Sequence, residues 1–225
     1  MPKVYDTVIK ICTSEGEIAV EQHHDGVISR KTVKPETLMK SILGSRFDNS
    51  VHTTGFLPEH CFSAALISGI IVYYMRYPNL YADISYFGTE YPDFPLPRLV
   101  FAIKYLSESG KIGDVRLAVV NDERLSPDTV TYAYPFSNVY SDCRICLGNN
   151  ALPVYKDPTR IHTLPQYILG FPNNNDMFRD TDNRLGLGYR DLLEHLKDKD
   201  PNYYYSDVLV PNGKTLKDFM NRGIN

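Results

Sequence analysis

The chain has 225 residues, with 24 Lys and Arg against 27 Asp and Glu and a net charge of −3 at neutral pH. Its 43% hydrophobic and 23% charged content is ordinary for a globular protein, and its length allows one large domain or a core with an extension. The slightly acidic balance and the lack of a Lys/Arg run give no electrostatic basis for nucleic-acid binding.

Neither membrane insertion nor export is expected. The most apolar stretch, Phe62 to Tyr74, has about 13 residues, whereas a membrane helix needs roughly 20. The first residues lack the apolar region of a signal peptide, so we expect a cytoplasmic protein. Four cysteines in a chain of this length do not form a disulfide framework and are expected to be reduced thiols.

The N-terminal part, residues 1–50, is predicted to be an extension made of a β-hairpin, a further strand and a helix. The predicted strands cover Tyr5–Cys12, Glu17–Glu21 and Val27–Val33. Pro35 stands where the first turn of a helix tolerates proline, and the apolar face that follows ends at Gly44. A polar loop over Ser45–Thr54 leads into the predicted core, residues 51–225.

The core begins with β-rich segments that turn residues separate at short, regular spacing, which is typical of an antiparallel meander. The predicted strands cover Phe62–Tyr74, Tyr81–Phe87, Arg98–Tyr105, Asp114–Val120 and Thr129–Tyr134. Three prolines within Tyr91–Pro97 favour an extended, rigid surface crossing over a ladder strand. Amphipathic patterns then predict helices over Leu164–Leu169, Tyr189–Leu196 and Thr215–Met220. Strands first and helices last indicate an α+β fold.

The most informative segment runs from Tyr134 to Leu147. Asn138 stands eight residues before Cys146, with a turn between them and a short apolar strand predicted to carry the thiol. This layout resembles the active-site segment of ubiquitin-conjugating enzymes, His-Pro-Asn-[Val/Ile]-Tyr-x-Asp-Gly-x-[Ile/Val]-Cys-Leu. The residues in register are Asn138, Val139, Tyr140, Asp142, Ile145, Cys146 and Leu147. Phe136 and Ser137 stand at the histidine and proline positions, and Cys143 replaces the turn glycine.

Further segments resemble one bacterial branch of that superfamily, the conjugating-enzyme-like family called PRTRC system protein B. They are Thr54–Pro58, Tyr73–Tyr77 and Leu96–Ala102, followed by the strand and motif order up to Asn150 and, more loosely, to Leu196. The resemblance implies a ubiquitin-conjugating-like meander with an active-site loop and C-terminal helices. Members of this branch lack the motif histidine. An insertion over Lys104–Tyr134 departs from the ubiquitin-conjugating enzymes.

The resemblance also implies a function and partners. Cys146 would carry a ubiquitin-like modifier as a thioester, received from an adenylating activating enzyme, and pass it to an acceptor without a cofactor of its own. A JAB-type metallopeptidase would belong to the same pathway. A free cysteine is only partly ionised at neutral pH yet strongly nucleophilic, and Arg144 is predicted to share the face of Cys146 and favour its thiolate. The alternative for Cys146 is a small buried hydrophobe.

Other site residues have two interpretations each. The amide of Asn138 would donate to an oxyanion or brace the loop, or it caps its own loop as an Asx-turn. Asp142 stabilises the turn, or it orients an incoming lysine and helps to accept its proton. In the polar loop that follows, Asn174, Asn175 or Asp176 is a gate or proton acceptor, or the loop is an ordinary solvated turn.

The same residues are compatible with other functions. Cys143 and Cys146 would be half of a zinc site if Cys12 and Cys61, or a histidine, completed it. A thioredoxin-type redox role needs a helix after the motif, and Gly148-Asn-Asn does not start one well. The rival from another class is a conjugating-fold protein that has lost catalysis and serves as an adaptor or scaffold. An enzyme predicts faster alkylation of Cys146 than of Cys143, whereas an adaptor does not require it.

Overall fold

Contacts between residues divide the chain into two compact units, Met1–Thr53 and Thr54–Asn225. The computed structural model describes residues 6–12, 17–24, 26–44, 56–67 and 69–224. The loop predicted over Ser45–Thr54 lies outside these ranges. Whether the extension and the core fold as separate domains stays a prediction.

The first unit contains a three-stranded antiparallel sheet in the order β1-β2-β3, followed by a helix. Its elements are β1 (Asp6–Cys12), β2 (Glu17–His24), β3 (Val27–Val33) and α1 (Pro35–Gly44). Glu21 on the central strand lies 3.0 Å from Lys10 Nζ and 3.3 Å from Arg30 Nε. Opposite charges on facing strands favour this strand order.

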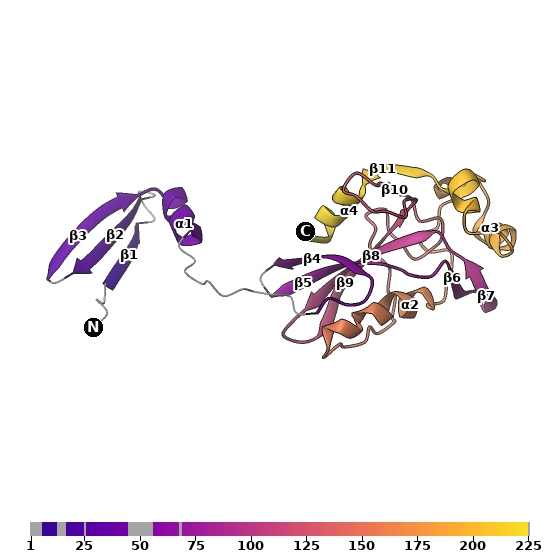
Figure 1. Cartoon of the computed structure of the whole chain (residues 1–225), viewed down its shortest axis with the longest axis horizontal. Coiled ribbons are helices and arrows are strands. Elements are labelled where there is room, and N and C mark those ends of the chain that lie inside the picture. Colours follow the sequence, from indigo (N-terminus) through magenta and orange to yellow (C-terminus); the bar gives the residue numbers. More distant parts are fainter. Residues whose placement is uncertain (1–5, 13–16, 25, 45–55, 68, 225) are drawn as a thin grey trace. The chain divides into compact units, whose positions relative to one another are not determined.

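The second unit is built on a six-stranded antiparallel sheet in the order β11-β10-β9-β8-β5-β4 (Figure 1). Its strands are β4 (Cys61–Ile67), β5 (Ile70–Arg76), β8 (Arg98–Leu106), β9 (Lys111–Val120), β10 (Val130–Tyr132) and β11 (Pro211–Thr215). A separate hairpin pairs β6 (Tyr81–Tyr86) with β7 (Thr89–Pro95). Its α-helices are α2 (Leu164–Leu169), α3 (Tyr189–Leu196) and α4 (Leu216–Ile224).

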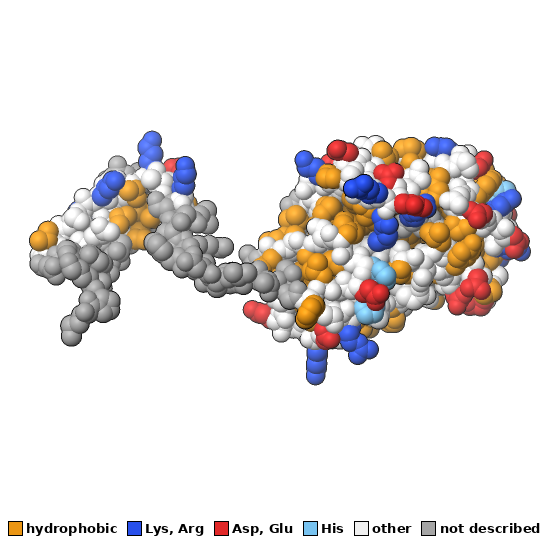
Figure 2. Space-filling model, in the orientation of Figure 1, with side chains coloured by type: hydrophobic (Ala, Val, Ile, Leu, Met, Phe, Trp, Pro, Cys, Tyr) orange, Lys and Arg blue, Asp and Glu red, His pale blue; other side chains and the backbone are white. Residues whose placement is uncertain are grey.

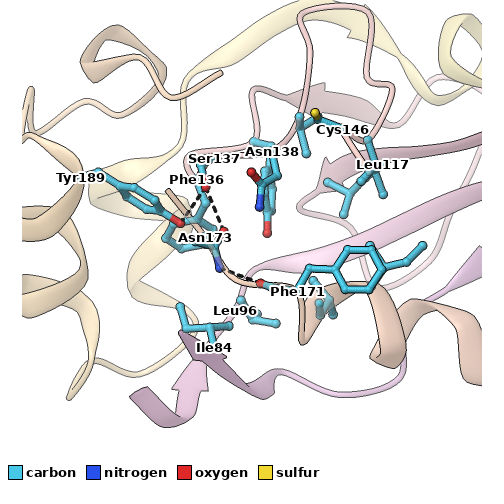
Figure 3. A pocket seen from close by; sticks show the side chains of 15 residues that line it. Ile84, Leu96, Leu117, Phe136, Ser137, Asn138, Cys146, Phe171, Asn173 and Tyr189 are labelled. Carbon is cyan, nitrogen blue, oxygen red and sulfur yellow. Dashed lines mark hydrogen bonds between the residues drawn. The ribbon is translucent and has the colours of Figure 1, made fainter. Parts of the chain in front are cut away.

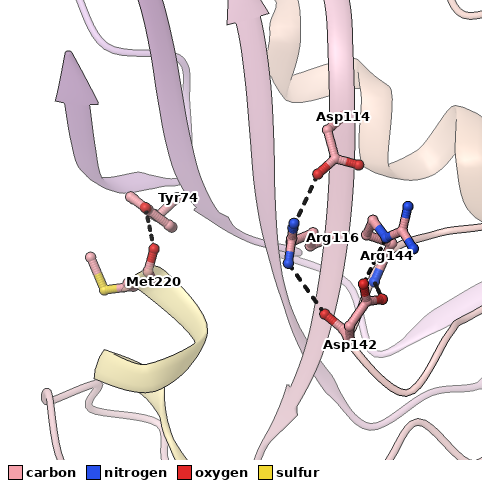
Figure 4. Close-up of polar contacts among 6 residues, drawn as sticks. All are labelled: Tyr74, Asp114, Arg116, Asp142, Arg144 and Met220. Atoms are coloured by element: carbon pink, nitrogen blue, oxygen red, sulfur yellow. Dashed lines mark hydrogen bonds and ion pairs between the residues drawn. The ribbon is translucent and has the colours of Figure 1, made fainter. Parts of the chain in front are cut away.

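The central strands of this sheet are buried on both faces. Successive strand residues point to opposite faces, so alternate residues of β5, β8 and β9 enter two different buried clusters. The larger cluster includes side chains of α2 and α3, and the smaller one includes Leu216 and Phe219 of α4. Tyr74 on β5 also donates its hydroxyl to the carbonyl of Met220 at 2.7 Å, which fastens α4 to the sheet (Figure 4).

The predicted α+β class is confirmed. Helices α2 and α3 have the predicted bounds, and α4 runs further than predicted, to Ile224. On the face seen in Figure 2, acidic and basic side chains are interspersed over the second unit. No helix among the described residues is both long and apolar enough to cross a membrane.

The single strand predicted over Phe62–Tyr74 is wrong. The segment contains β4 except for Cys61, and most of β5, and these two strands pair antiparallel as a hairpin. Gly69, at the turn, has a φ of 82°, a left-handed conformation that glycine adopts without steric cost. Strand β5 is buried between β4 and β8, whereas β4 is only partly buried and exposes Phe62 and Leu66. Both strands are nevertheless apolar in sequence, so hydrophobicity alone does not separate them.

The surface crossing predicted over Tyr91–Pro97 is also wrong. Thr89–Pro95 is strand β7, and Tyr91, Phe94 and Leu96 are buried. A two-stranded hairpin hydrogen-bonds on one side only, so its prolines lose no ladder partner on the open side. The hairpin also interrupts the predicted meander, because β8 pairs directly with β5 and the predicted strand Tyr81–Phe87 lies outside the main sheet.

A chain that begins at Thr54 is expected to fold on its own. Both buried clusters of the second unit consist, among the described residues, of side chains from that unit alone. Circular dichroism during heating should therefore show one cooperative transition for residues 54–225, with a midpoint close to a transition of the full chain. Loss of cooperative unfolding in the truncated chain would contradict the separation into units.

Candidate functional site

The segment from Asn138 to Cys146 folds back on itself as a tight loop. The Tyr140 N–H donates to the carbonyl of Arg144 at 2.8 Å, and the Cys143 N–H donates to the carbonyl of Tyr140 at 2.9 Å. The Cys146 N–H then donates to the carbonyl of Asn138 at 2.7 Å and closes the loop. The eight-residue spacing of the motif therefore brings Asn138 and Cys146 side by side.

This loop extends the main sheet along the edge of β9. The Ile145 N–H donates to the carbonyl of Val115, and the Leu117 N–H donates to the carbonyl of Cys143, both at 2.9 Å. Strand β10 pairs only with the end of β9, at positions 119 and 120, so it leaves this stretch of edge free. The predicted apolar strand is reduced to isolated bridges, and Cys146 follows them in irregular backbone.

Cys146 is half-buried at the edge of a narrow crevice (Figure 3). The crevice has a volume of ≈ 30 Å³ and is lined mainly by apolar side chains, with Asn138, Ser137 and Asn173 as polar members. That volume holds only a water molecule or two, whereas pockets for small molecules measure about 300–1,000 Å³. The site therefore offers a thiol at a surface and not a chamber for a small substrate.

Asn138 joins the cysteine loop to the later loop that contains Pro172 and Asp176. Its side-chain Nδ2 donates to the carbonyl of Pro172 at 3.2 Å, and its backbone N–H donates to the carbonyl of Asp176 at 3.0 Å. Figure 3 shows the amide directed toward the segment of Phe171 and Asn173. This geometry favours a brace between two loops over an Asx-turn that caps its own loop. Asn138 also has a φ of 65°, which asparagine tolerates better than most residues.

The loop that braces Asn138 is itself held by the β6–β7 hairpin. The Asn173 N–H donates to the carbonyl of Ser85 at 2.9 Å, and the Tyr86 hydroxyl donates to Asn175 Oδ1 at 2.8 Å. Asn174 Nδ2 donates to the carboxylate of Asp176 at 2.9 Å. These contacts are those of an ordinary surface turn, and a role of Asn174, Asn175 or Asp176 as a gate or proton acceptor stays a prediction.

Phe136, at the motif's histidine position, is buried in an aromatic cluster. Its ring centroid lies 5.7 Å from that of Phe94, 5.3 Å from Tyr134 and 6.2 Å from Tyr204. The adjacent Ser137 is buried too, and its hydroxyl donates to Asn173 Oδ1 at 2.9 Å. Phe136 therefore supports the loop by packing alone, and the hydrogen bond at this point comes from the adjacent Ser137.

Asp142 is placed against Arg144 (Figure 4). Its carboxylate accepts the backbone N–H of Arg144 at 3.1 Å and the Nε–H at 2.7 Å. Burial alone would raise the pKa of Asp142, but the hydrogen bonds and charge of Arg144 outweigh burial and hold the pKa below its usual value. This geometry supports the turn-stabilising interpretation of Asp142.

Arg144, predicted to share the face of Cys146 and favour its thiolate, makes its described side-chain contacts with other residues. The Arg144 guanidinium binds Asp142 and lies over the Tyr140 ring, with Cζ 5.3 Å from the ring centroid. It is Tyr140 that reaches the sulfur, because its hydroxyl donates to Cys146 Sγ at 3.7 Å. The motif register includes Tyr140, but register alone does not indicate that contact.

The two cysteines of the loop face different surroundings. Cys146 lines the crevice, whereas Cys143 packs against the smaller buried cluster on the α4 side of the sheet. Burial raises the pKa of the Cys143 thiol. Among the described residues no group of three His, Cys, Asp or Glu side chains could hold a metal ion. The arrangement thus gives no support to a dithiol redox pair or to a zinc site.

The antiparallel sheet with C-terminal helices and a cysteine loop at its edge is compatible with a ubiquitin-conjugating-like fold. The sequence matches prokaryotic E2 family D over residues 35–212, and the chain belongs to this bacterial family of conjugating-enzyme-like proteins. The match begins at Pro35 and so includes helix α1 of the first unit. No curated protein and no solved structure matches the chain.

Substitution of Cys143 is expected to depend on backbone conformation. Cys143 has a φ of 72°, and this left-handed conformation costs a non-glycine residue about 1–2 kcal/mol, more if the side chain is β-branched. Cys143→Val should therefore lower the free energy of unfolding by at least about 1 kcal/mol relative to Cys143→Gly, as measured by urea denaturation. Equal stability of the two variants would show that the turn does not require this conformation.

Proposed function

We propose that this protein carries a ubiquitin-like modifier as a thioester on Cys146 and transfers it to an acceptor. The observation that supports this most is the position of the Cys146 thiol, half-buried at a crevice edge, in a loop whose residues are in register with the conjugating-enzyme motif. Membership of prokaryotic E2 family D supports the same chemistry.

Loading would be a thiol exchange. The Cys146 sulfur attacks the carbonyl carbon of the modifier's C-terminal thioester on the activating enzyme. The new C–S bond forms, the old C–S bond breaks, and the proton of the Cys146 thiol passes to the departing sulfur. Adenylation precedes this exchange on the activating enzyme, so the carrier itself requires no cofactor.

Discharge would follow the same course with a different nucleophile. An acceptor amine attacks the thioester carbon, a C–N bond forms, and the electron pair of the broken C–S bond returns to the Cys146 sulfur. The proton that the amine loses restores the thiol. Asn138 would assist by bracing the loop through the N–H that it donates to Pro172. Its second amide N–H would donate to the developing oxyanion, and such a donor is typically worth about 10²–10³ in rate. Asp142 would maintain the turn through Arg144.

The partners follow from the same proposal. They are a ubiquitin-like modifier, its adenylating activating enzyme and a JAB-type metallopeptidase in a cytoplasmic pathway of the PRTRC type. The second candidate function is an adaptor or scaffold that keeps the fold without catalysis. The fully packed Phe136, which leaves no titratable group at the histidine position, is the observation that favours this candidate.

The proposal is tested by mixing the full chain with the activating enzyme of its own gene neighbourhood, the modifier and ATP. We expect an adduct that a reductant releases, that is absent from Cys146→Ala and that persists in Cys143→Ala, because only Cys146 lines the crevice. Gel mobility with and without reductant, followed by mass spectrometry, measures it.

The controls separate the two candidate functions. An adduct that survives in Cys146→Ala would move the chemistry to another residue. If the activating enzyme carries the modifier as a thioester but transfers none of it to the intact chain, the adaptor function is favoured.

A further inference from the structure

We propose that Tyr140 is a positioning residue whose hydroxyl holds the Cys146 sulfur and favours its thiolate form. The inference deepens the proposed function, because it concerns the same thiol. It begins from the hydrogen bond in which Tyr140 Oη donates to Cys146 Sγ at 3.7 Å.

Backbone contacts fix the position of Tyr140. Its N–H donates to the carbonyl of Arg144 at 2.8 Å, and its carbonyl accepts the Cys143 N–H at 2.9 Å. The residue is therefore pinned at both of its backbone polar groups by the turn that separates it from Cys146. The ring reaches the sulfur from a backbone that is already ordered, so little further ordering is needed for the contact.

A second set of contacts fixes the ring. The guanidinium of Arg144 lies over the ring face, with Cζ 5.3 Å from the ring centroid, in a cation–π arrangement. Its Nε–H donates to the carboxylate of Asp142 at 2.7 Å, and the Arg144 backbone N–H donates to the same carboxylate at 3.1 Å (Figure 4). Arg116 donates to the backbone carbonyl of Asp142 at 3.4 Å and so supports the same turn. Asp142 and Arg144 thereby act on the thiol through Tyr140.

The charged groups described around the loop pair with one another and not with the Cys146 sulfur. Arg144 pairs with Asp142, and Arg116 pairs with Asp114 at 3.0 Å, so carboxylates offset both positive charges. Among the described hydrogen bonds, the one to the Cys146 sulfur comes from the Tyr140 hydroxyl. The same contact raises the pKa of Tyr140, as expected for a phenol that must keep its proton to donate it.

The chemical consequence follows from the charge on the acceptor. A hydroxyl donates a stronger hydrogen bond to an ionised acceptor than to a neutral one. The contact therefore stabilises the thiolate over the thiol, which aids attack during loading. It equally stabilises the sulfur when the C–S bond breaks and the electron pair returns to Cys146 during discharge.

Alkylation of Cys146 tests the inference directly. The full chain and its Tyr140→Phe variant are treated with iodoacetamide across the pH range in which cysteines ionise, and modification of Cys146 is followed by peptide mass spectrometry. Tyr140→Phe keeps the ring under Arg144 and removes only the hydroxyl. We expect its Cys146 to react about three- to ten-fold more slowly at neutral pH, with the midpoint of the rate profile at higher pH.

Tyr132→Phe is the matched control. Tyr132 is half-buried and lines a neighbouring groove with Tyr140, so the variant removes a similar hydroxyl without touching the sulfur. It should leave the profile of Cys146 unchanged. A Tyr140→Phe profile that coincides with the wild-type profile, or an equal change in Tyr132→Phe, would overturn the inference.

The adduct assay separates this inference from the proposed function. An intact chain that forms the thioester while Tyr140→Phe alkylates like the wild type would refute the role of Tyr140 alone. A slower Tyr140→Phe thiol in a chain that never accepts the modifier would support the role of Tyr140 and refute the carrier function.

Discussion

The candidate site depends on one backbone hydrogen bond, from the Cys146 N–H to the carbonyl of Asn138 at 2.7 Å. It closes a loop whose two ends would otherwise diverge, and it sets the thiol beside the amide. The loop is then held on two sides. Strand β9 binds it through Val115 and Leu117, and the following segment binds it at Asn138. Because each of these contacts uses backbone groups or a side-chain amide, the position of the thiol requires neither a metal nor a histidine.

The segment over residues 104–134 gives the cysteine loop its place on the sheet. It contributes β9 and the short β10, and β10 covers only the far end of β9. The remaining edge would expose unpaired N–H and C=O groups, and the cysteine loop satisfies them. At the histidine position of the motif, the ring of Phe136 packs against the rings of Phe94 and Tyr134, so the start of the loop is held by aromatic packing.

Sequence patterns predict those parts of this structure that depend on local periodicity or on a continuous motif. The apolar spacing of Tyr189–Leu196 predicts α3 correctly, and the register of the motif predicts that Asn138 and Cys146 belong to one loop. The hairpin within Phe62–Tyr74 has no such signal, because the residues of both strands are apolar and only Gly69 marks the turn between them. The hydrogen bond between Asn138 and Pro172 joins residues 34 positions apart, so no local sequence pattern predicts it. Whether Arg144 contacts Asp142 or Cys146 depends on its side-chain conformation, which the sequence does not specify either.

We propose that this loop presents one thiol for chemistry, while the thiols of Cys61 and Cys143 serve packing. Burial raises the pKa of Cys61 and of Cys143, whereas Cys146 stands at the edge of the crevice. The most direct measurement is the alkylation rate of each of these three cysteines in the unmodified full chain at neutral pH, resolved by peptide mass spectrometry. We expect Cys146 to react first. If Cys143 or Cys61 reacted before it, Cys146 would not be the thiol that the loop presents for chemistry.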